Sequence, residues 1–140
     1  MKKKARILII DDEYVIRVGC QQTLEPAGYE VDFAENGIIG LAKLHDHEYD
    51  LVILDIMMPQ ISGKQLIESI RKYDPSIMII AITGYGTPEL LDEIIQMGAA
   101  ASLAKPFTPN ELRGAVQQAL ARRTELSLKS SSYQQQTLMN

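Results

Sequence analysis

Five side chains with polar or charged groups follow short apolar runs of this 140-residue chain, at points far apart in the sequence. They are Asp11, Asp12, Asp55, Thr83 and Lys105. A carboxylate can act as a nucleophile towards a phosphoryl group, and clustered carboxylates suit Mg²⁺. Phosphoryl transfer depends mainly on positioning and charge neutralisation, which a metal, an ammonium and a hydroxyl supply. The residue types therefore predict phosphoryl chemistry, provided that the fold brings them together.

The apolar runs themselves have the character of β-strands. Three of them are continuously apolar, which is typical of parallel strands covered by helices on both faces. The run Glu30–Phe33 alternates instead, which indicates a more exposed edge strand. The expected strands are Arg6–Ile10, Tyr29–Ala34, Leu51–Leu54, Ile77–Ile82 and Ala100–Leu103.

Helical patterns separate these strands and complete five βα units. Thr87 and Thr108 are good N-caps, each followed by proline at the first helical position. Glu111 stands three residues after Thr108 and predicts a capping box. The alternation predicts an α/β fold with an open, doubly wound, five-stranded parallel sheet, in the flavodoxin-like strand order 2-1-3-4-5.

In such a sheet the carboxyl ends of the strands meet at one rim, where ligands bind. Asp11 and Asp12, with Glu13 beside them, would then lie near Asp55. Two carboxylates about 4 Å apart repel each other by roughly 4 kcal/mol at an effective dielectric constant near 20. We therefore expect a cation among them, either Lys105 or a hard divalent metal.

At these positions the sequence resembles the receiver domains of two-component response regulators, the CheY-like family. The resemblance covers residues 5–122, and its motifs together are specific although each alone is weak. The matching segments are Asp11-Asp12, Asp55–Pro59 with Gly63, Ile82–Gly84 and Lys105–Phe107.

The resemblance implies a role for each matching residue. Asp55 would be the phosphoacceptor, supplied by a histidine kinase or a phosphotransfer protein, and the chain would be no enzyme beyond its own phosphotransfer. Thr83 would be the switching hydroxyl, and Lys105 would pair with the phosphoryl oxygens. The Lys105–Pro106 peptide bond would be cis.

The same resemblance implies a magnesium site. Its ligands would be Asp11, Asp12, Asp55 and the backbone carbonyl of Met57. Met57 and Tyr85 occupy two positions that tune self-dephosphorylation in the family, and neither positions water well, so we predict slow loss of the phosphoryl group.

One position departs from the family pattern. Ser102 stands three residues before Lys105, where receivers usually carry an aromatic ring that moves with the switching threonine. Tyr85 is a hypothetical substitute for that ring. A receiver that binds its partner without phosphorylation is therefore an open alternative.

Two other functions fit the residues poorly. An aspartate-nucleophile phosphatase would carry its nucleophile after the first strand in an Asp-x-Asp pattern, whereas Asp55 follows the third and Met57 stands two residues later. A flavodoxin-like cofactor binder would need a phosphate loop rich in Ser, Thr and Gly in place of the acidic Asp11–Glu13.

Composition bounds the remaining functions. The net charge of −4 argues against direct nucleic-acid binding by this segment. Cys20 is the single cysteine, it falls in a helical apolar pattern, and the cytoplasm is the predicted compartment. No apolar run is long enough to cross a membrane.

The sequence does not identify the output of the chain. Residues 123–140 are expected to form a polar tail or a linker to an output domain, and the output partner is unknown. The usual output face of such domains would include Leu90, Asp92, Glu93, Gln96 and Arg113.

Overall fold

A computed structural model describes residues 3–58 and 60–139, so that Pro59 of the predicted motif lies outside the described residues. Its centre is a five-stranded, all-parallel sheet in the order β2-β1-β3-β4-β5. The predicted fold and strand order are confirmed. The strands are β1 (Arg6–Ile10), β2 (Glu30–Ala34), β3 (Leu51–Asp55), β4 (Met78–Thr83) and β5 (Ala101–Ala104).

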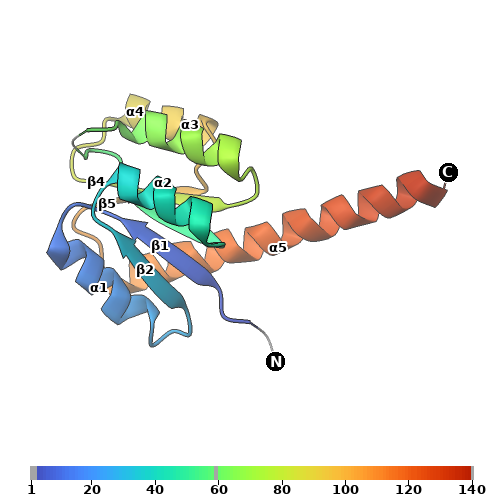
Figure 1. The fold of residues 1–140 in the computed structure, drawn as a ribbon, viewed down its shortest axis with the longest axis horizontal. Coiled ribbons are helices and arrows are strands. Elements are labelled where there is room, and N and C mark those ends of the chain that lie inside the picture. Colours follow the sequence, from blue (N-terminus) through green and yellow to red (C-terminus); the bar gives the residue numbers. More distant parts are fainter. Residues whose placement is uncertain (1–2, 59, 140) are drawn as a thin grey trace.

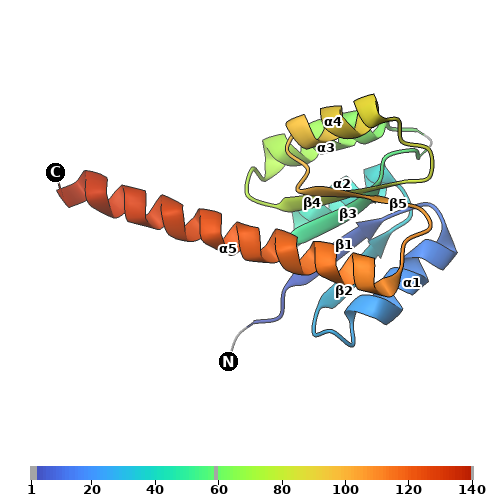
Figure 2. The same cartoon turned by 180° about the vertical axis from the view of Figure 1, so that it is seen from behind.

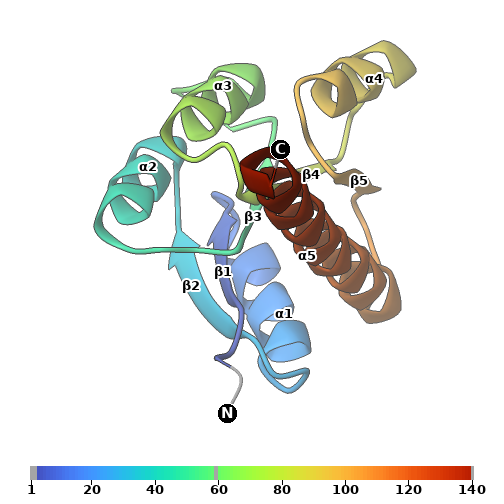
Figure 3. The ribbon, with the colours of Figure 1, turned by 90° about the vertical axis from the view of Figure 1, so that its right-hand side faces the viewer.

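Five helices among the described residues cover the two faces of this sheet. Figures 1 and 3 show α2, α3 and α4 on one face and α1 and α5 on the other. The helices are α1 (Tyr14–Leu24), α2 (Gly37–Asp46), α3 (Gly63–Tyr73), α4 (Pro88–Gln96) and α5 (Pro109–Met139). None of them, over the part of the chain that the structure describes, combines the length and apolarity that a bilayer crossing requires.

The continuously apolar runs are explained by burial on both faces. Along β1, Leu8 and Ile10 pack into the core beneath α2–α4, while Ile7 and Ile9 pack into the core beneath α1 and α5. Cys20 belongs to the second core and is buried, and burial raises the pKa of its thiol to about 12. Cys20 is therefore core filler, as its position in the helical pattern indicates.

Two strands are displaced by a single residue from their predicted bounds, and others differ at one end. Strand β4 runs one residue further than predicted and includes Thr83, and β3 includes Asp55. Both polar residues keep the extended backbone because their main-chain groups still join the sheet ladder, as in the pairs Asp55–Ile82 and Thr83–Ala104. Asp55 and Thr83 thus stand on strands rather than on loops.

Helix α5 extends further than the apolar pattern indicates. It continues through the polar segment to Met139 and projects away from the sheet, as Figure 2 shows. Arg123 is held to the body of the domain by an ion pair with Asp50 and a hydrogen bond to the carbonyl of Ser76. The assignment of residues 123–140 as a tail or linker outside the domain stays a prediction.

Capping residues fix where the helices begin. Thr87 accepts a hydrogen bond from the amide of Leu90, and Thr108 forms the predicted capping box with Glu111. A second capping box joins Ser62 and Gln65 at the start of α3, which the sequence analysis did not identify. This box fixes the start of α3 at Gly63, directly after the loop that follows Asp55.

The start of α3 also requires a residue without a side chain. A Cβ atom placed on Gly63 would lie 2.6 Å from the Cα atom of Ile56, which is backbone and cannot rotate away. Glycine therefore lets α3 approach the chain immediately after the proposed phosphoacceptor.

We expect Gly63→Ala to lower the free energy of unfolding by roughly 1–3 kcal/mol, the usual cost of overpacking. Gly114→Ala is the matched control, because a Cβ atom at this position in α5 meets only open space. The control should gain about 0.5–1 kcal/mol from helix propensity. Urea unfolding of both variants measures the difference, and equal behaviour would contradict the packing argument.

Candidate functional site

The parallel sheet brings together residues from four separate segments of the chain. Asp11 follows β1, Asp55 ends β3, Thr83 ends β4 and Lys105 follows β5. Because all strands point the same way, their carboxyl ends lie along one rim. Asp11, Asp12, Glu13 and Asp55 form an acidic cluster there, and the Lys105 side chain contacts this cluster.

Lys105 is the centre of this cluster. Its Nζ atom lies 2.9 Å from Oδ2 of Asp55, 3.1 Å from Oδ2 of Asp11 and 3.2 Å from Oε1 of Glu13. It donates hydrogen bonds to Asp55 and Glu13, whereas the contact with Asp11 has ion-pair distance without hydrogen-bond geometry. The Lys105–Pro106 bond is cis, as predicted.

Burial makes these charges interact strongly. Asp11 is fully buried, and burial raises its pKa against the opposing effects of the Glu13 amide and the Lys105 charge. Burial alone would lower the pKa of Lys105, but the hydrogen bond to Asp55 and the negative charges of Asp11 and Asp55 outweigh it and raise that pKa. Lys105 is thus firmly cationic and is the local counter-ion of the buried carboxylates.

Backbone amides aim the two buried carboxylates. The amide of Glu13 donates to Oδ1 of Asp11 at 2.8 Å, and the amide of Met57 donates to Oδ1 of Asp55 at 2.8 Å. In each case the amide lies two residues after the aspartate, so the loop itself orients the side chain. The Oδ2 atoms of both residues are left to face the interior of the cluster and Lys105.

The acidic cluster has the donor chemistry of a divalent-cation site. Asp11, Asp12, Glu13 and Asp55 each offer one carboxylate oxygen, and these oxygens lie within 4.8 Å of one another. Oδ2 of Asp11 is buried and accepts no hydrogen bond from the described residues, which is costly unless a cation approaches it. Oxygen-only donors of this kind fit Mg²⁺.

Thr83 lies at the end of β4 and is buried. Its Oγ1 atom accepts a hydrogen bond from the amide of Tyr85 at 3.1 Å, which ties the start of the following loop to the site. The Tyr85 side chain is 86% exposed and does not fill an interior position. Ser102 is half-buried and pairs with Ala81 of the neighbouring strand β4.

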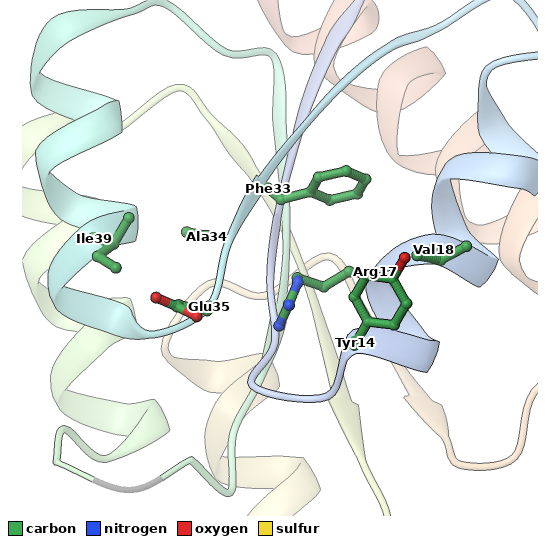
Figure 4. A pocket seen from close by; sticks show the side chains of 7 residues that line it. All are labelled: Tyr14, Arg17, Val18, Phe33, Ala34, Glu35 and Ile39. Carbon is green, nitrogen blue, oxygen red and sulfur yellow. The ribbon is translucent and has the colours of Figure 1, made fainter.

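A small hollow of about 310 Å³ adjoins the site over the edge strand β2. Figure 4 shows the Arg17 side chain extending from α1 into the space between α1 and α2. Its Nη1 atom donates to the carbonyl of Asp11 at 2.8 Å and so fixes the backbone of the acidic pair. No local sequence pattern indicates this role for Arg17, because its contact with the Asp11 carbonyl depends on the packing of α1 beside the loop after β1.

Glu13 also received no role from sequence alone. Its position directly after the acidic pair was the available signal, but a residue preceding a helix is commonly only a cap. In the structure its side chain makes no capping hydrogen bond and turns to Lys105 instead.

Comparison with known proteins agrees with this geometry. The family model described as "Response regulator receiver domain" matches residues 7–117. The chain belongs to the response regulator receiver family. It is therefore a receiver domain of two-component phosphorelay signalling, as the sequence resemblance indicates.

Relatives and solved structures support the same assignment. Sporulation initiation phosphotransferase F of Bacillus subtilis is 34% identical over 82% of this chain and 93% of its own length. Transcriptional regulatory protein CusR of Escherichia coli is 34% identical over 89% of this chain and 55% of its own length. A CheY-like receiver from Methanospirillum hungatei superposes with a TM-score of 0.84 at 33% identity, covering 88% of this chain and 98% of that one.

The relatives differ in length. This receiver spans nearly all of the Bacillus phosphotransferase but only about half of the matched transcriptional regulators. The family assignment consequently applies to the receiver domain, and it does not extend to the output of the longer relatives.

We expect Asp11→Asn to stabilise the metal-free domain at neutral pH. Because burial raises the pKa of Asp11 above its ordinary 3.8, the charged carboxylate is less favourable in the folded state, and stability falls as pH rises from 3.8 through the folded-state value. Removing the charge should raise the free energy of unfolding by about 1 kcal/mol. This is the order of the repulsion between the Asp11 and Asp55 carboxylates after Lys105 has offset part of it.

Asp12→Asn is the matched control, since Asp12 is exposed and should change stability by less than about 0.5 kcal/mol. Urea unfolding with a chelator present at pH 7 measures both variants. A loss of stability in Asp11→Asn, or an equal gain in the two, would contradict the assignment of the buried charge as the source of repulsion.

Proposed function

We propose that Asp55 accepts a phosphoryl group from a histidine kinase or a phosphotransfer protein, in a Mg²⁺-dependent reaction. The observation that carries this proposal is the Asp55 carboxylate itself. It is almost buried at the end of β3, oriented by the Met57 amide and paired with Lys105 at 2.9 Å. Membership of the receiver family supports the same role.

The contacts of Asp55 fit nucleophilic attack on phosphorus. A carboxylate oxygen would form a bond to phosphorus while the phosphorus–nitrogen bond of a phosphohistidine breaks, giving an acyl phosphate; the leaving nitrogen keeps the electron pair and takes a proton from solvent, which restores the neutral imidazole. Lys105 lies close enough to follow the charge from the carboxylate to the phosphoryl oxygens. The Thr83 hydroxyl, also at the rim, would donate to a phosphoryl oxygen after releasing the Tyr85 amide.

Asp11, Asp12, Asp55 and the backbone carbonyl of Met57 are the proposed protein ligands of Mg²⁺. The bound ion would neutralise charge on the phosphoryl group during transfer. The fit rests on the four clustered carboxylates and on the buried Oδ2 atom of Asp11, which contacts the Lys105 ammonium but accepts no hydrogen bond from the described residues.

Incubation with Mg²⁺ and acetyl phosphate, followed by intact mass measurement, tests the proposal. We expect the gain of one phosphoryl group, abolished in Asp55→Ala and by chelation of the metal. Asp46→Ala is the control, because Asp46 is exposed at the end of α2 and outside the acidic cluster. An unphosphorylated wild type under every donor, or full labelling of Asp55→Ala, would overturn the proposal.

The output of phosphorylation is proposed to pass through the face of α4, β5 and α5 to a binding partner or a fused output domain. Asp92, Glu93 and Gln96 are exposed there, while Leu90 and Arg113 are half-buried. Matched transcriptional regulators about twice as long favour a fused domain, and the nearly full-length match to the Bacillus phosphotransferase favours a separate partner. The cytoplasm stays the predicted compartment, based on the single cysteine.

A second candidate is a receiver that binds its partner without phosphorylation. The half-buried Ser102 favours it, because a serine cannot act as the moving aromatic ring. The complete acidic cluster favours the phosphorylated receiver instead. That Tyr85 takes the role of the moving aromatic ring stays a hypothesis. Its ring is exposed, and its amide donates a hydrogen bond to Thr83.

We predict that phosphorylated Asp55 is lost over minutes or longer, because neither Met57 nor Tyr85 has a carboxylate or amide to position an attacking water. Both side chains are exposed. Met57→Asn should speed the loss several-fold, since an amide at that position can orient water beside the acyl phosphate. Decay of the phosphorylated mass after removal of acetyl phosphate measures the rate, and a wild-type half-life of seconds contradicts the prediction.

A further inference from the structure

Lys105 is held by carboxylates that differ greatly in exposure. The side chains of Asp11 and Asp55 are buried, and that of Lys105 is only 14% exposed. The Glu13 side chain is 58% exposed and contacts Lys105 from the solvent side. Ordinary exposed ion pairs contribute little, but here one partner is a largely buried ammonium with a raised pKa.

Mg²⁺ and the Lys105 ammonium would compete for the same buried oxygens. The acidic cluster that fits Mg²⁺ includes Asp11 and Asp55, whose Oδ2 atoms are both within 3.1 Å of the Lys105 ammonium. When Mg²⁺ is bound, the ammonium has to give up some of these contacts because like charges repel strongly at such distances. Lys105 must nevertheless stay close to receive the phosphoryl oxygens.

Glu13 is placed to resolve this conflict. Mg²⁺ keeps several waters when it binds to a protein, so a cluster of four acids has more oxygens than the ion needs. Glu13 belongs to that cluster. Its side chain makes no capping hydrogen bond to α1, and it accepts a hydrogen bond from Lys105. Of the three acids around Lys105, it alone is not among the proposed metal ligands.

We propose that Glu13 is a positioning residue, which retains the Lys105 ammonium at the mouth of the site while Asp11 and Asp55 bind Mg²⁺. This inference rests on the proposed function of the site. Without the Glu13 carboxylate, Lys105 has only the metal-binding acids as partners, and it competes with the ion more strongly. Glu13 would therefore act on metal affinity through Lys105, rather than by ligating the metal.

A double-mutant cycle on Mg²⁺ affinity tests this role, with calorimetric titration of the metal alone as the readout. Glu13→Gln should weaken Mg²⁺ binding about tenfold, the usual scale of a lost hydrogen bond to a charged group. Lys105→Met should tighten binding, because it removes the competing cation. Adding Glu13→Gln to Lys105→Met should then change affinity by less than about threefold, since the interaction partner is gone.

Glu48→Gln is the matched control, because it removes the same charge near the amino-terminal end of β3, opposite the site. It should leave Mg²⁺ affinity within about twofold of the wild type, given screening over that distance. Circular dichroism establishes that each variant is folded, and Lys105→Gln replaces Lys105→Met in the cycle if the latter does not fold.

An equal loss of affinity from Glu13→Gln in both Lys105 backgrounds would overturn the proposal, because Glu13 would then act on the metal directly. An unchanged affinity in the single variant would overturn it as well. Either result can occur while Asp55 still gains a phosphoryl group from acetyl phosphate, so failure here is distinct from failure of the proposed function. Wild-type protein that neither binds Mg²⁺ nor is phosphorylated would overturn both.

Discussion

Repulsion among carboxylates that the sheet forces together is the constraint on which the site depends. Asp11 and Asp55 stand at the ends of adjacent strands, and burial denies them the screening that water provides. Lys105 offsets part of this repulsion by contacting both residues and Glu13. One ammonium cannot neutralise four acids, however, so the metal-free site retains an excess of negative charge, and the buried Oδ2 atom of Asp11 accepts no hydrogen bond from the described residues.

The remaining repulsion among these carboxylates is the basis of the chemistry proposed for the site. A divalent cation would relieve this repulsion, and the proposed phosphoryl transfer requires that the negative charge be offset. The stability of the fold is supplied elsewhere, by the two apolar cores above and below the sheet. A rigid, well-packed scaffold can therefore hold an unfavourable arrangement of charges at its rim, a trade that is common at functional sites.

Transmission of the signal rests on fewer contacts. Thr83 connects the site to the loop before α4 through a single hydrogen bond to the Tyr85 amide. In the family the switch usually also involves an aromatic ring, whereas this chain has Ser102 on β5 and an exposed ring on Tyr85. Displacement of the β4–α4 loop through this hydrogen bond is thus the coupling that we propose for the switch.

The fold could be predicted from the sequence because its signals are local. Continuously apolar runs such as Ile7–Ile10 indicate strands buried on both faces, and residues such as Thr87 and Thr108 indicate where helices begin. Alternation of these elements restricts the topology to few choices, and the parallel direction of the strands then places Asp11, Asp55 and Lys105 at one rim. Element ends were less predictable, since polar Thr83 continues β4 through main-chain pairing that its side chain does not reveal.

The sequence by itself therefore determined the architecture and the family, and it singled out the side chains that are proposed to react. Only the tertiary structure decided how those side chains share their charges. The contact of Glu13 with Lys105 spans 92 positions of the chain, and that of Arg17 with the Asp11 carbonyl depends on how α1 packs. Such contacts depend on distances of a few ångströms between segments remote in sequence, whereas local patterns specify only which face or end of an element a residue occupies.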